Sequence, residues 1–431
     1  MKILWITKHP IVPINTGSQI RTYYLIKNLS THSDITVVCS RGPGITDDTC
    51  DPLAELPKVN IQYPLENLDS LSARLQLSFW KHYSSLREKY CWGEHPLSQA
   101  HSPLYMWHRF LVEWIGKHNP RVIILDHIWH AETLKYLKRR YPDVKFIINF
   151  HNVESINMYR YLEKEERGTR RARVFAKLHK KIQERESNLF RYADLYWTCS
   201  KHDLDVLSQL QRKKSISGFV VPNGIDTASY RFDQNSNKQS ENALIFVGVL
   251  RYPLVVDALM WFFKYVWPIV KKERAGIRFK MVGLDPGKKL KELALSDKSI
   301  ELVGTVDDVR PQYKDASVSV CPIQSGSGTR IKILEAMSVG VPVVATSIGA
   351  EGIESVDKKH LLLADNPTDF AKAIMNLLND EKLYNSIQRN ARKLVESQYD
   401  WSFISREASQ SITASFQVPV VTCDASHREK V

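Results

Sequence analysis

The chain has 431 residues, of which 43% are hydrophobic and 25% charged, a composition typical of a folded globular protein with two or three domains. This composition argues against extensive disorder, and no apolar run reaches the roughly 18 residues that a membrane-spanning helix needs. The formal net charge of +13 favours an anionic partner such as a nucleotide, a nucleic acid or an anionic lipid surface, although a basic pI can also describe solubility alone.

The six cysteines are scattered, without a CxxC pair and without metal-type spacing to histidine. This usage is typical of a reducing cytoplasm, and it indicates no metal site. The first seven residues, MKILWIT, are too short for the hydrophobic part of a secretory signal and run into His9-Pro10. We therefore expect a cytoplasmic protein.

In the first half of the chain, short apolar runs alternate with helical stretches. Strands are predicted at residues 2–7, 34–40, 121–127, 145–151 and 195–200, a helix at 17–29, and a mostly helical, aromatic-rich region at 70–118. Apolar strands separated by helices predict a parallel sheet covered on both faces.

The second half repeats this scheme. Strands are predicted at residues 243–250, 277–283, 300–306, 317–323 and 341–346, and helices at 255–272, 288–296, 368–378 and 381–398. The polar stretch 233–242 reads as a surface loop near the domain boundary, and residues 417–431 as a loose tail. Two doubly wound α/β halves result, with ligands expected outside the carboxyl ends of the strands.

The segment 317–346 reads as strand, glycine loop, helix and strand, and it breaks two local rules. Arg330 and Lys332 lie in the first helical turn, where cations oppose the helix dipole, and Glu335 follows in an apolar helix. A diphosphate bound at the loop would compensate the two cations, and a ribose or sugar hydroxyl would give Glu335 a hydrogen-bond partner. The alternative is a structural βαβ unit in which Lys332 and Glu335 simply pair.

These features resemble the GT-B glycosyltransferases, most closely glycosyltransferase family 4 and its Gly-Thr-Arg-x-Lys-x-Leu-Glu branch. The matching motifs are GSQIR at 17–21, HNVE at 151–154, VPNGID at 221–226, FVG at 246–248 and GTRIKILEAM at 328–337. The resemblance implies two Rossmann-like domains facing a cleft. It implies an acceptor domain at 1–220, a nucleotide-sugar domain at 221–399, a helix at 400–415 that packs back on the first domain, and a tail at 416–431.

The resemblance also implies roles for individual residues, and no metal or cofactor. His151 is the catalytic candidate, expected to orient the donor sugar; from the residues alone a strand-end hydrogen bond is the favoured interpretation, and the resemblance reverses that preference. Arg21 and Glu154 fall on the acceptor side, and Glu154 could orient His151 or cap the following helix. The expected donor-binding residues are Gly17, Asn223, Gly224, Gly248, Arg251, Gly328, Thr329, Arg330, Lys332 and Glu335.

The chain departs from the family pattern in the donor site. Ser327 stands where many members carry a second glutamate, and Val249 and Val255 stand near positions where many carry an arginine and a lysine for the diphosphate. We expect Arg330 and Lys332, with or without Arg251, to supply that charge instead.

The resemblance implies a retaining, nucleotide-sugar-dependent hexosyltransferase that extends a polysaccharide or a lipid-linked glycan. No carboxylate nucleophile is assigned, because members are commonly proposed to react on one face, with the leaving phosphate accepting the acceptor's proton. One alternative is a GT-B nucleotide-sugar epimerase. Another is a catalytically degenerate GT-B protein that binds a partner transferase or a glycan, an alternative that Ser327 and Val249 keep open.

Residues 163–191 hold ten Lys and Arg against five Glu. A basic helix in the acceptor domain could contact anionic lipid headgroups, which would place the protein peripherally at the inner face of the cell membrane. The alternative is a solvated helix face. Nucleic-acid binding is not expected, because no basic groove with interleaved aromatic residues is evident.

Overall fold

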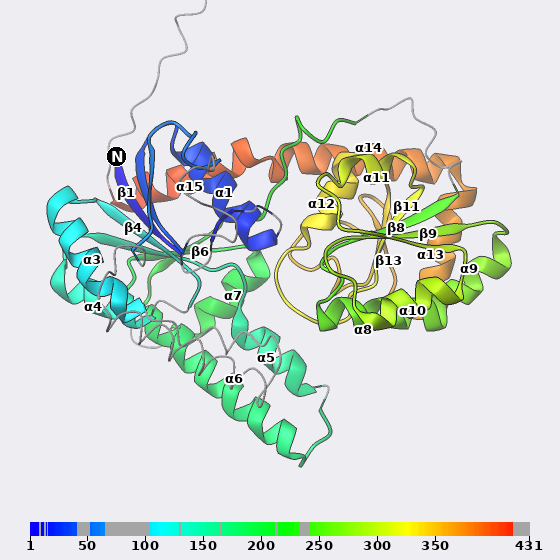
Figure 1. Ribbon diagram of the computed structural model, residues 1–431, viewed down its shortest axis with the longest axis horizontal. Coiled ribbons are helices and arrows are strands. Elements are labelled where there is room, and N and C mark those ends of the chain that lie inside the picture. Colours follow the sequence, from blue (N-terminus) through cyan, green and yellow to red (C-terminus); the bar gives the residue numbers. More distant parts are fainter. Residues whose placement is uncertain are drawn as a thin grey trace, which may run out of the picture.

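The computed structural model describes residues 1–7, 10–12, 14, 16–40, 52–64, 104–128, 131–163, 165–211, 214–232 and 242–416. It contains two α/β domains side by side, each built on one parallel sheet flanked by helices (Figure 1). The predicted fold class, two doubly wound Rossmann-like domains, is confirmed.

The N-terminal domain has a seven-stranded sheet in the order β3-β2-β1-β4-β5-β6-β7. The order reverses between β1 and β4, so the loops that follow these strands lie where doubly wound folds bind ligands. Its elements are β1 (Lys2–Ile6), α1 (Gly17–Leu29), β2 (Asp34–Val38), β3 (Val59–Gln62), α3 (Leu104–His118), β4 (Val122–Asp126), α4 (Ala131–Arg140), β5 (Lys145–Asn149), α5 (Glu154–Glu163), α6 (Arg170–Leu189), β6 (Leu195–Thr198), α7 (Lys201–Gln209) and β7 (Ser217–Val220).

The C-terminal domain has a six-stranded sheet in the order β10-β9-β8-β11-β12-β13, and here the order reverses between β8 and β11. The loops after those two strands carry Gly248 and the glycine-rich segment. Its elements are β8 (Ala243–Val247), α8 (Pro253–Trp261), η5 (Phe262–Val266), α9 (Trp267–Glu273), β9 (Arg278–Val282), α10 (Lys288–Ser296), β10 (Ile300–Gly304), α11 (Arg310–Lys314), β11 (Val318–Cys321), α12 (Ile331–Ser338), β12 (Val343–Ala345), β13 (Leu362–Leu363), α13 (Pro367–Asn379), α14 (Glu381–Leu394), η6 (Val395–Tyr399) and α15 (Trp401–Phe416).

Within the described ranges one continuous helix, Pro253–Glu273, is long and apolar enough to cross a membrane. Length and composition alone are weak evidence for a span, because core helices of globular proteins meet the same criteria. Leu259, Phe262 and Val270 of this helix are buried in the core of the C-terminal domain. Packing in this core therefore accounts for part of the helix's apolar character.

Helix α15 runs from the C-terminal domain back onto the N-terminal domain (Figure 1). Ile404 and Ile412 are fully buried in the same cluster as residues of β1. The ring of Trp401 stacks on Tyr24 of α1, with centroids 5.3 Å apart and planes 3° apart. The last helix therefore fixes how the two domains sit relative to each other.

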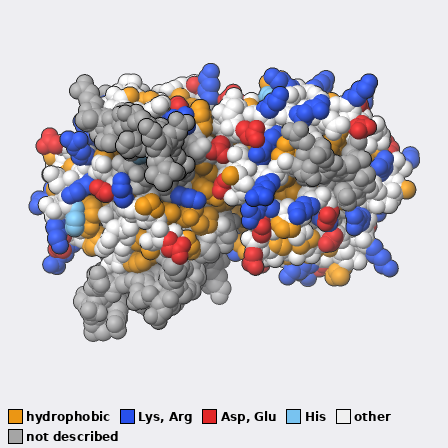
Figure 2. Space-filling view, turned by 90° about the horizontal axis from the view of Figure 1, so that it is seen from above, with side chains coloured by type: hydrophobic (Ala, Val, Ile, Leu, Met, Phe, Trp, Pro, Cys, Tyr) orange, Lys and Arg blue, Asp and Glu red, His pale blue; other side chains and the backbone are white. Residues whose placement is uncertain are grey.

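Three short strands, β3, β7 and β13, were absent from the sequence prediction. The first two lie at the edges of the N-terminal sheet and are partly exposed, so they lack the continuous apolar run that identifies a buried strand. The predictions at 70–103, 233–241 and 417–431 lie outside the described residues. On the face that Figure 2 shows, Lys and Arg side chains are spread over both domains.

Candidate functional site

The residues between β11 and α12, Gln324–Thr329, form what we call the glycine loop. Gly326 and Gly328 have φ values of 105° and 82°, which side chains with a Cβ adopt only with strain. A Cβ on Gly328 would lie 2.3 Å from Oδ1 of Asn152 in the N-terminal domain. The loop therefore needs glycine both for its backbone conformation and for its close contact with the other domain.

The carbonyl groups of the glycine loop are held by a guanidinium. Arg330 donates hydrogen bonds to the carbonyl oxygens of Ser327 and Gly328. In a trans peptide the N–H points away from the carbonyl, so the N–H groups of Gly328 and Thr329 face the other side of the loop. No described residue accepts a hydrogen bond from either N–H group. Successive backbone N–H groups without an acceptor are the kind of donor that binds anions in proteins.

Lys332 lies in the first turn of α12, beside this loop. Its Nζ is 4.0 Å from the ring centroid of Phe246, and burial lowers its pKa to about 8, an effect to which Arg330 adds. A Cβ on Gly248 would lie 2.4 Å from that Nζ, so the glycine after β8 makes room for the ammonium group. A buried ammonium with a depressed pKa gains stability from an anion placed next to it.

Glu335 is 9% exposed, and burial raises its pKa. Its Oε1 accepts a hydrogen bond from the Tyr230 hydroxyl at 3.1 Å and its Oε2 accepts one from Tyr313 at 3.3 Å. A carboxylate in an apolar helix needs hydrogen-bond or cation partners, and in the structure its partners are the two tyrosine hydroxyls. Each carboxylate oxygen keeps a further lone pair with which it can accept from a ligand hydroxyl.

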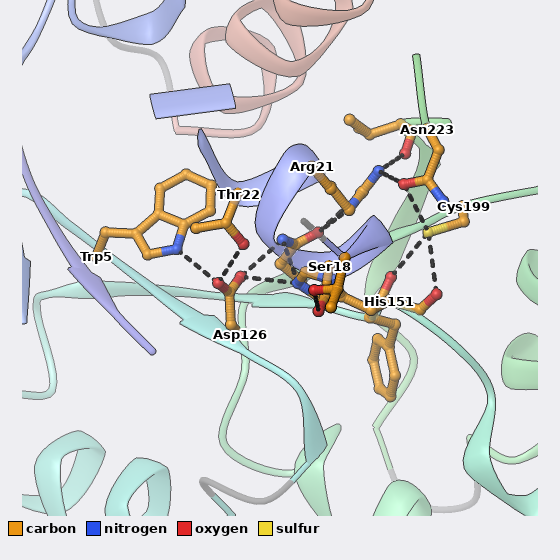
Figure 3. Close-up of polar contacts among 12 residues, drawn as sticks. Trp5, Ser18, Arg21, Thr22, Asp126, His151, Cys199 and Asn223 are labelled. Carbon is orange, nitrogen blue, oxygen red and sulfur yellow. Dashed lines mark hydrogen bonds and ion pairs between the residues drawn. The ribbon is translucent and has the colours of Figure 1, made fainter. Parts of the chain in front are cut away.

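A second group of polar residues lies at the carboxyl ends of β4 and β5 (Figure 3). His151 is 5% exposed, and its Nε2 lies 3.3 Å from Oδ1 of Asp126. A carboxylate only accepts hydrogen bonds, so we assign the proton to Nε2, facing Asp126; Nδ2 of Asn149 also lies 3.3 Å from Nε2 and donates to Oδ1 of Asp126 at 2.7 Å. The Nδ1 atom is buried and has no partner among the described residues, which leaves it as an acceptor for a ligand. Burial lowers the pKa of His151, against the opposing effect of Asp126, and so favours the neutral ring.

Asp126 was not identified from the sequence. It is fully buried and accepts hydrogen bonds from Trp5 at 2.9 Å and Thr22 at 2.8 Å. Burial would raise the pKa of Asp126, but the interactions with His151 and Trp5 outweigh that effect and hold it below its usual range. A fixed carboxylate of this kind orients the imidazole. The only sequence signal was its position at the end of a buried strand.

Arg21, placed on the acceptor side by the resemblance, lies in the N-terminal domain with its side chain fully buried. It donates to the carbonyl oxygens of Val221 at 2.6 Å and Pro222 at 3.0 Å, and to Asn149 at 2.8 Å (Figure 3). These contacts tie α1 to the segment that leads into the C-terminal domain. Arg21 therefore has a structural role.

Two further candidates, Asn223 and Gly224, also serve that inter-domain segment. Asn223 accepts from Cys199 at 3.8 Å, and a Cβ on Gly224 would lie 2.5 Å from Ile404 and 2.8 Å from the Tyr399 carbonyl oxygen. Their described contacts are with protein groups of the turn and the final helices.

The remaining predicted site residues lie in different parts of the two domains. Gly17 opens α1 and faces Ile331, the first residue of α12; a Cβ on Gly17 would be 3.4 Å from Cδ1 of Ile331. Thr329 donates to the Cys199 carbonyl oxygen at 3.3 Å. Glu154 begins α5 and accepts from Asn157 at 3.3 Å, and burial raises its pKa. Arg251 is 45% exposed and pairs with Asp285 at 3.4 Å.

In the part of the chain that the structure describes, no group of three or more His, Cys, Asp or Glu could hold a metal ion. Around the glycine loop, the positive elements of the site are the cations Arg330 and Lys332 and the backbone N–H groups. They suit an anion such as a diphosphate.

Comparison with known proteins gives a family match within the C-terminal domain. The family described as "Glycosyl transferases group 1" matches residues 241–380. An uncharacterised 44.6 kDa protein in the cps region of Klebsiella pneumoniae is 30% identical over 164 residues, 36% of this chain and 42% of that protein. Glycogen synthase of Mycobacterium tuberculosis is 24% identical over 307 residues, 68% of this chain and 69% of that protein.

Solved structures extend the likeness to nearly the whole chain. Sucrose-phosphate synthase of Thermosynechococcus elongatus has a TM-score of 0.72 at 15% identity, covering 97% of this chain and 99% of that one. Anabaena HepE in complex with UDP-glucose has a TM-score of 0.60 at 15% identity, covering 96% and 100%. The chain therefore has the GT-B fold, and its C-terminal domain carries the group 1 glycosyltransferase pattern.

Proposed function

We propose that this protein is a retaining glycosyltransferase of family 4, in its Gly-Thr-Arg-x-Lys-x-Leu-Glu branch. It moves a hexose from a nucleotide-sugar to a glycan or lipid-linked acceptor in cell-surface or exopolysaccharide synthesis. The observation that carries the proposal is the glycine loop, in which the N–H groups of Gly328 and Thr329 meet no acceptor among the described residues, followed directly by Lys332 in the first turn of α12. The group 1 match over 241–380 and the relative encoded in a cps region support it.

The donor diphosphate is held by the glycine loop and by the start of α12. Its charge offsets the burial of Lys332, and no metal or cofactor is required for that role. Glu335 accepts hydrogen bonds from the ribose hydroxyls, alongside the two tyrosine hydroxyls. Arg330 contributes mainly by holding the loop carbonyls, because its recorded hydrogen bonds go to Ser327 and Gly328.

The proposed transfer reaction depends on stabilising the leaving nucleoside diphosphate. The bond between the anomeric carbon and the diphosphate oxygen breaks while the acceptor oxygen bonds to the same face, and the leaving phosphate takes the acceptor's proton. Positive groups already in place at the loop stabilise the charge that develops on that phosphate. His151, held by Asp126, accepts a hydrogen bond from a donor-sugar hydroxyl through Nδ1 and so fixes the sugar's position.

Helix α6 is the candidate contact with an anionic membrane. Arg170, Arg173, Lys177, Lys180 and Lys181 are exposed, and their three- and four-residue spacing places them on one face of the helix. The apolar face, with Phe175 and Ile182, packs against the domain. The α5–α6 pair projects from the body of the N-terminal domain (Figure 1), so a peripheral position at the inner face of the cell membrane fits this stripe.

Liposome flotation tests the membrane contact. Binding to vesicles with anionic lipid should be strong at low salt, weak at high salt and reduced by Lys177→Glu with Lys181→Glu. Equal binding to vesicles with and without anionic lipid would contradict this part of the proposal.

A thermal-shift panel of nucleoside diphosphates and nucleotide-sugars, with a chelator present, tests the donor site. A ligand that binds the folded state raises the unfolding midpoint by mass action. We expect one nucleotide series to shift the midpoint without metal. A panel without any shift would instead favour a degenerate GT-B protein that binds a partner or a glycan.

A further inference from the structure

One arginine of the N-terminal domain reaches into the donor loops of the C-terminal domain. Arg160, near the end of α5, donates from Nη2 to Oε2 of Glu351 at 2.6 Å and from Nη1 to Oε1 at 3.0 Å. Its Nη1 also donates to the carbonyl oxygen of Gly326 in the glycine loop. The side chains of Arg160 and Glu351 are 17% and 21% exposed, so this two-pronged pair is largely shielded from water.

Arg160 completes a set of contacts to the glycine loop. The carbonyl oxygens of three consecutive residues are bound by guanidinium groups: that of Gly326 by Arg160, and those of Ser327 and Gly328 by Arg330. Arg330 belongs to the loop's own domain, whereas Arg160 comes from the other one. Because each trans peptide points its N–H away from its carbonyl, Arg160 sets the direction of the Ser327 N–H. No described residue accepts a hydrogen bond from that N–H group.

We infer that Arg160 is a positioning residue, which gives the glycine loop its donor-binding form only when the two domains are together. The inference rests on the proposed function, since the loop's ligand is the donor. It assigns the N-terminal domain a part in shaping the donor site. Ser327 is the residue whose peptide N–H Arg160 orients.

The charges around Glu351 give the Arg160–Glu351 pair an electrostatic effect on the glycine loop in addition to its packing. Glu351 interacts electrostatically with both Arg160 and Arg330, and with the buried Asp203. Without Arg160, the Glu351 carboxylate faces Asp203 with less compensation and attracts Arg330 away from the Ser327 and Gly328 carbonyls. Loss of one arginine therefore loosens all three carbonyl contacts of the loop.

The test compares Arg160→Met with a matched control. Arg109→Met removes an arginine from another Arg–Glu pair, Arg109 with Glu113 at 2.9 Å, whose side chains are 90% and 65% exposed. Donor kcat/KM, the affinity for the nucleoside diphosphate alone and the unfolding midpoint are measured for each full-length variant. We expect R160M to lower donor kcat/KM on the order of 100-fold, because misplacing a positioned group has effects of that size. R109M should stay within about twofold of the wild type.

Two further variants separate positioning from stability. Arg160→Lys keeps the charge without the planar fork and should recover part of the lost kcat/KM. Glu351→Gln breaks the pair from the other side, and it serves in place of R160M if that variant does not fold. Combined with R160M, it should add little to the single loss.

The outcomes are distinct. If the wild type neither binds nor consumes any donor, the proposed function fails and the inference falls with it. If the wild type is active, and R160M or E351Q lowers only the unfolding midpoint while kcat/KM matches R109M, the inference alone is overturned.

Discussion

Lys332 should make nucleotide binding depend on pH in the range from 7 to 9.5. Burial lowers its pKa from 10.5 to about 8, so keeping the ammonium charged at neutral pH costs the unliganded protein about 3 kcal/mol. A bound diphosphate removes most of that cost, because it stabilises the charged form and raises the pKa. Binding near pH 8 should therefore take up about half a proton per site.

The sign of the effect follows from the direction of the shift. Below pH 8 the ammonium is already charged in the free protein, so affinity changes little. Above pH 8 each unit should weaken binding up to about tenfold, because the free protein must first take up a proton. The ligand's own phosphate, with a pKa of about 6, is about nine-tenths ionised at pH 7 and almost fully ionised from pH 8 upwards, so the weakening above pH 8 comes from Lys332.

Isothermal titration calorimetry of a nucleoside diphosphate between pH 7 and 9.5, in buffers of different ionisation enthalpy, measures both the affinity and the proton uptake. Lys332→Met should bind more weakly at pH 7 and lose the pH dependence above pH 8. If Lys332→Met keeps the wild-type pH profile, the placement of the diphosphate beside this residue is refuted.

Three further variants test the rest of the site. Glu335→Ala should weaken nucleoside diphosphate binding about tenfold or more, since hydrogen bonds to charged groups are worth about 1.5–3 kcal/mol; calorimetry showing unchanged affinity would exclude its contact with ribose. In Asp126→Asn, the new amide can donate to Nε2 of His151 and so shift the ring proton to Nδ1. The kcat should then fall at least tenfold while the affinity for the nucleoside diphosphate stays unchanged. Equal losses in kcat and affinity would contradict the orienting role of Asp126. Gly328→Ala should abolish donor binding. Its control is Gly168→Ala, which is strained by a similar φ of 85° but has no atom within 4 Å of the new Cβ, so it should lower only the unfolding midpoint. Equal donor binding by the two variants would show that the close contact at Gly328 is irrelevant.

The elements best predicted from sequence are those whose signals are local. The buried strands β4 and β8 are continuous apolar runs, and α1 and α10 have the predicted bounds. The glycine loop was recognisable because its glycines and the misplaced cations Arg330 and Lys332 are adjacent in sequence. Whether these residues bind a donor stays a prediction until the titrations are done.

Other features depend on contacts between distant segments, which no local pattern reveals. Asp126 meets Trp5 across 121 residues, and Arg160 meets Gly326 across 166. Arg21 is a further case: its motif placed it on the acceptor side, and its burial under the returning chain at Val221 and Pro222 was not predicted. Such positions become visible only once the order of the strands and the packing of the two domains are known.

The most direct test of the account is release of the nucleoside diphosphate from nucleotide-sugars by the purified full-length protein, with a chelator present and Lys332→Met as the comparison. The account predicts that the wild type consumes one donor series without metal, by transfer or slow hydrolysis, and that Lys332→Met is strongly impaired. Metal-dependent consumption, equal rates for the two proteins, or no consumption of any donor by the wild type would contradict it.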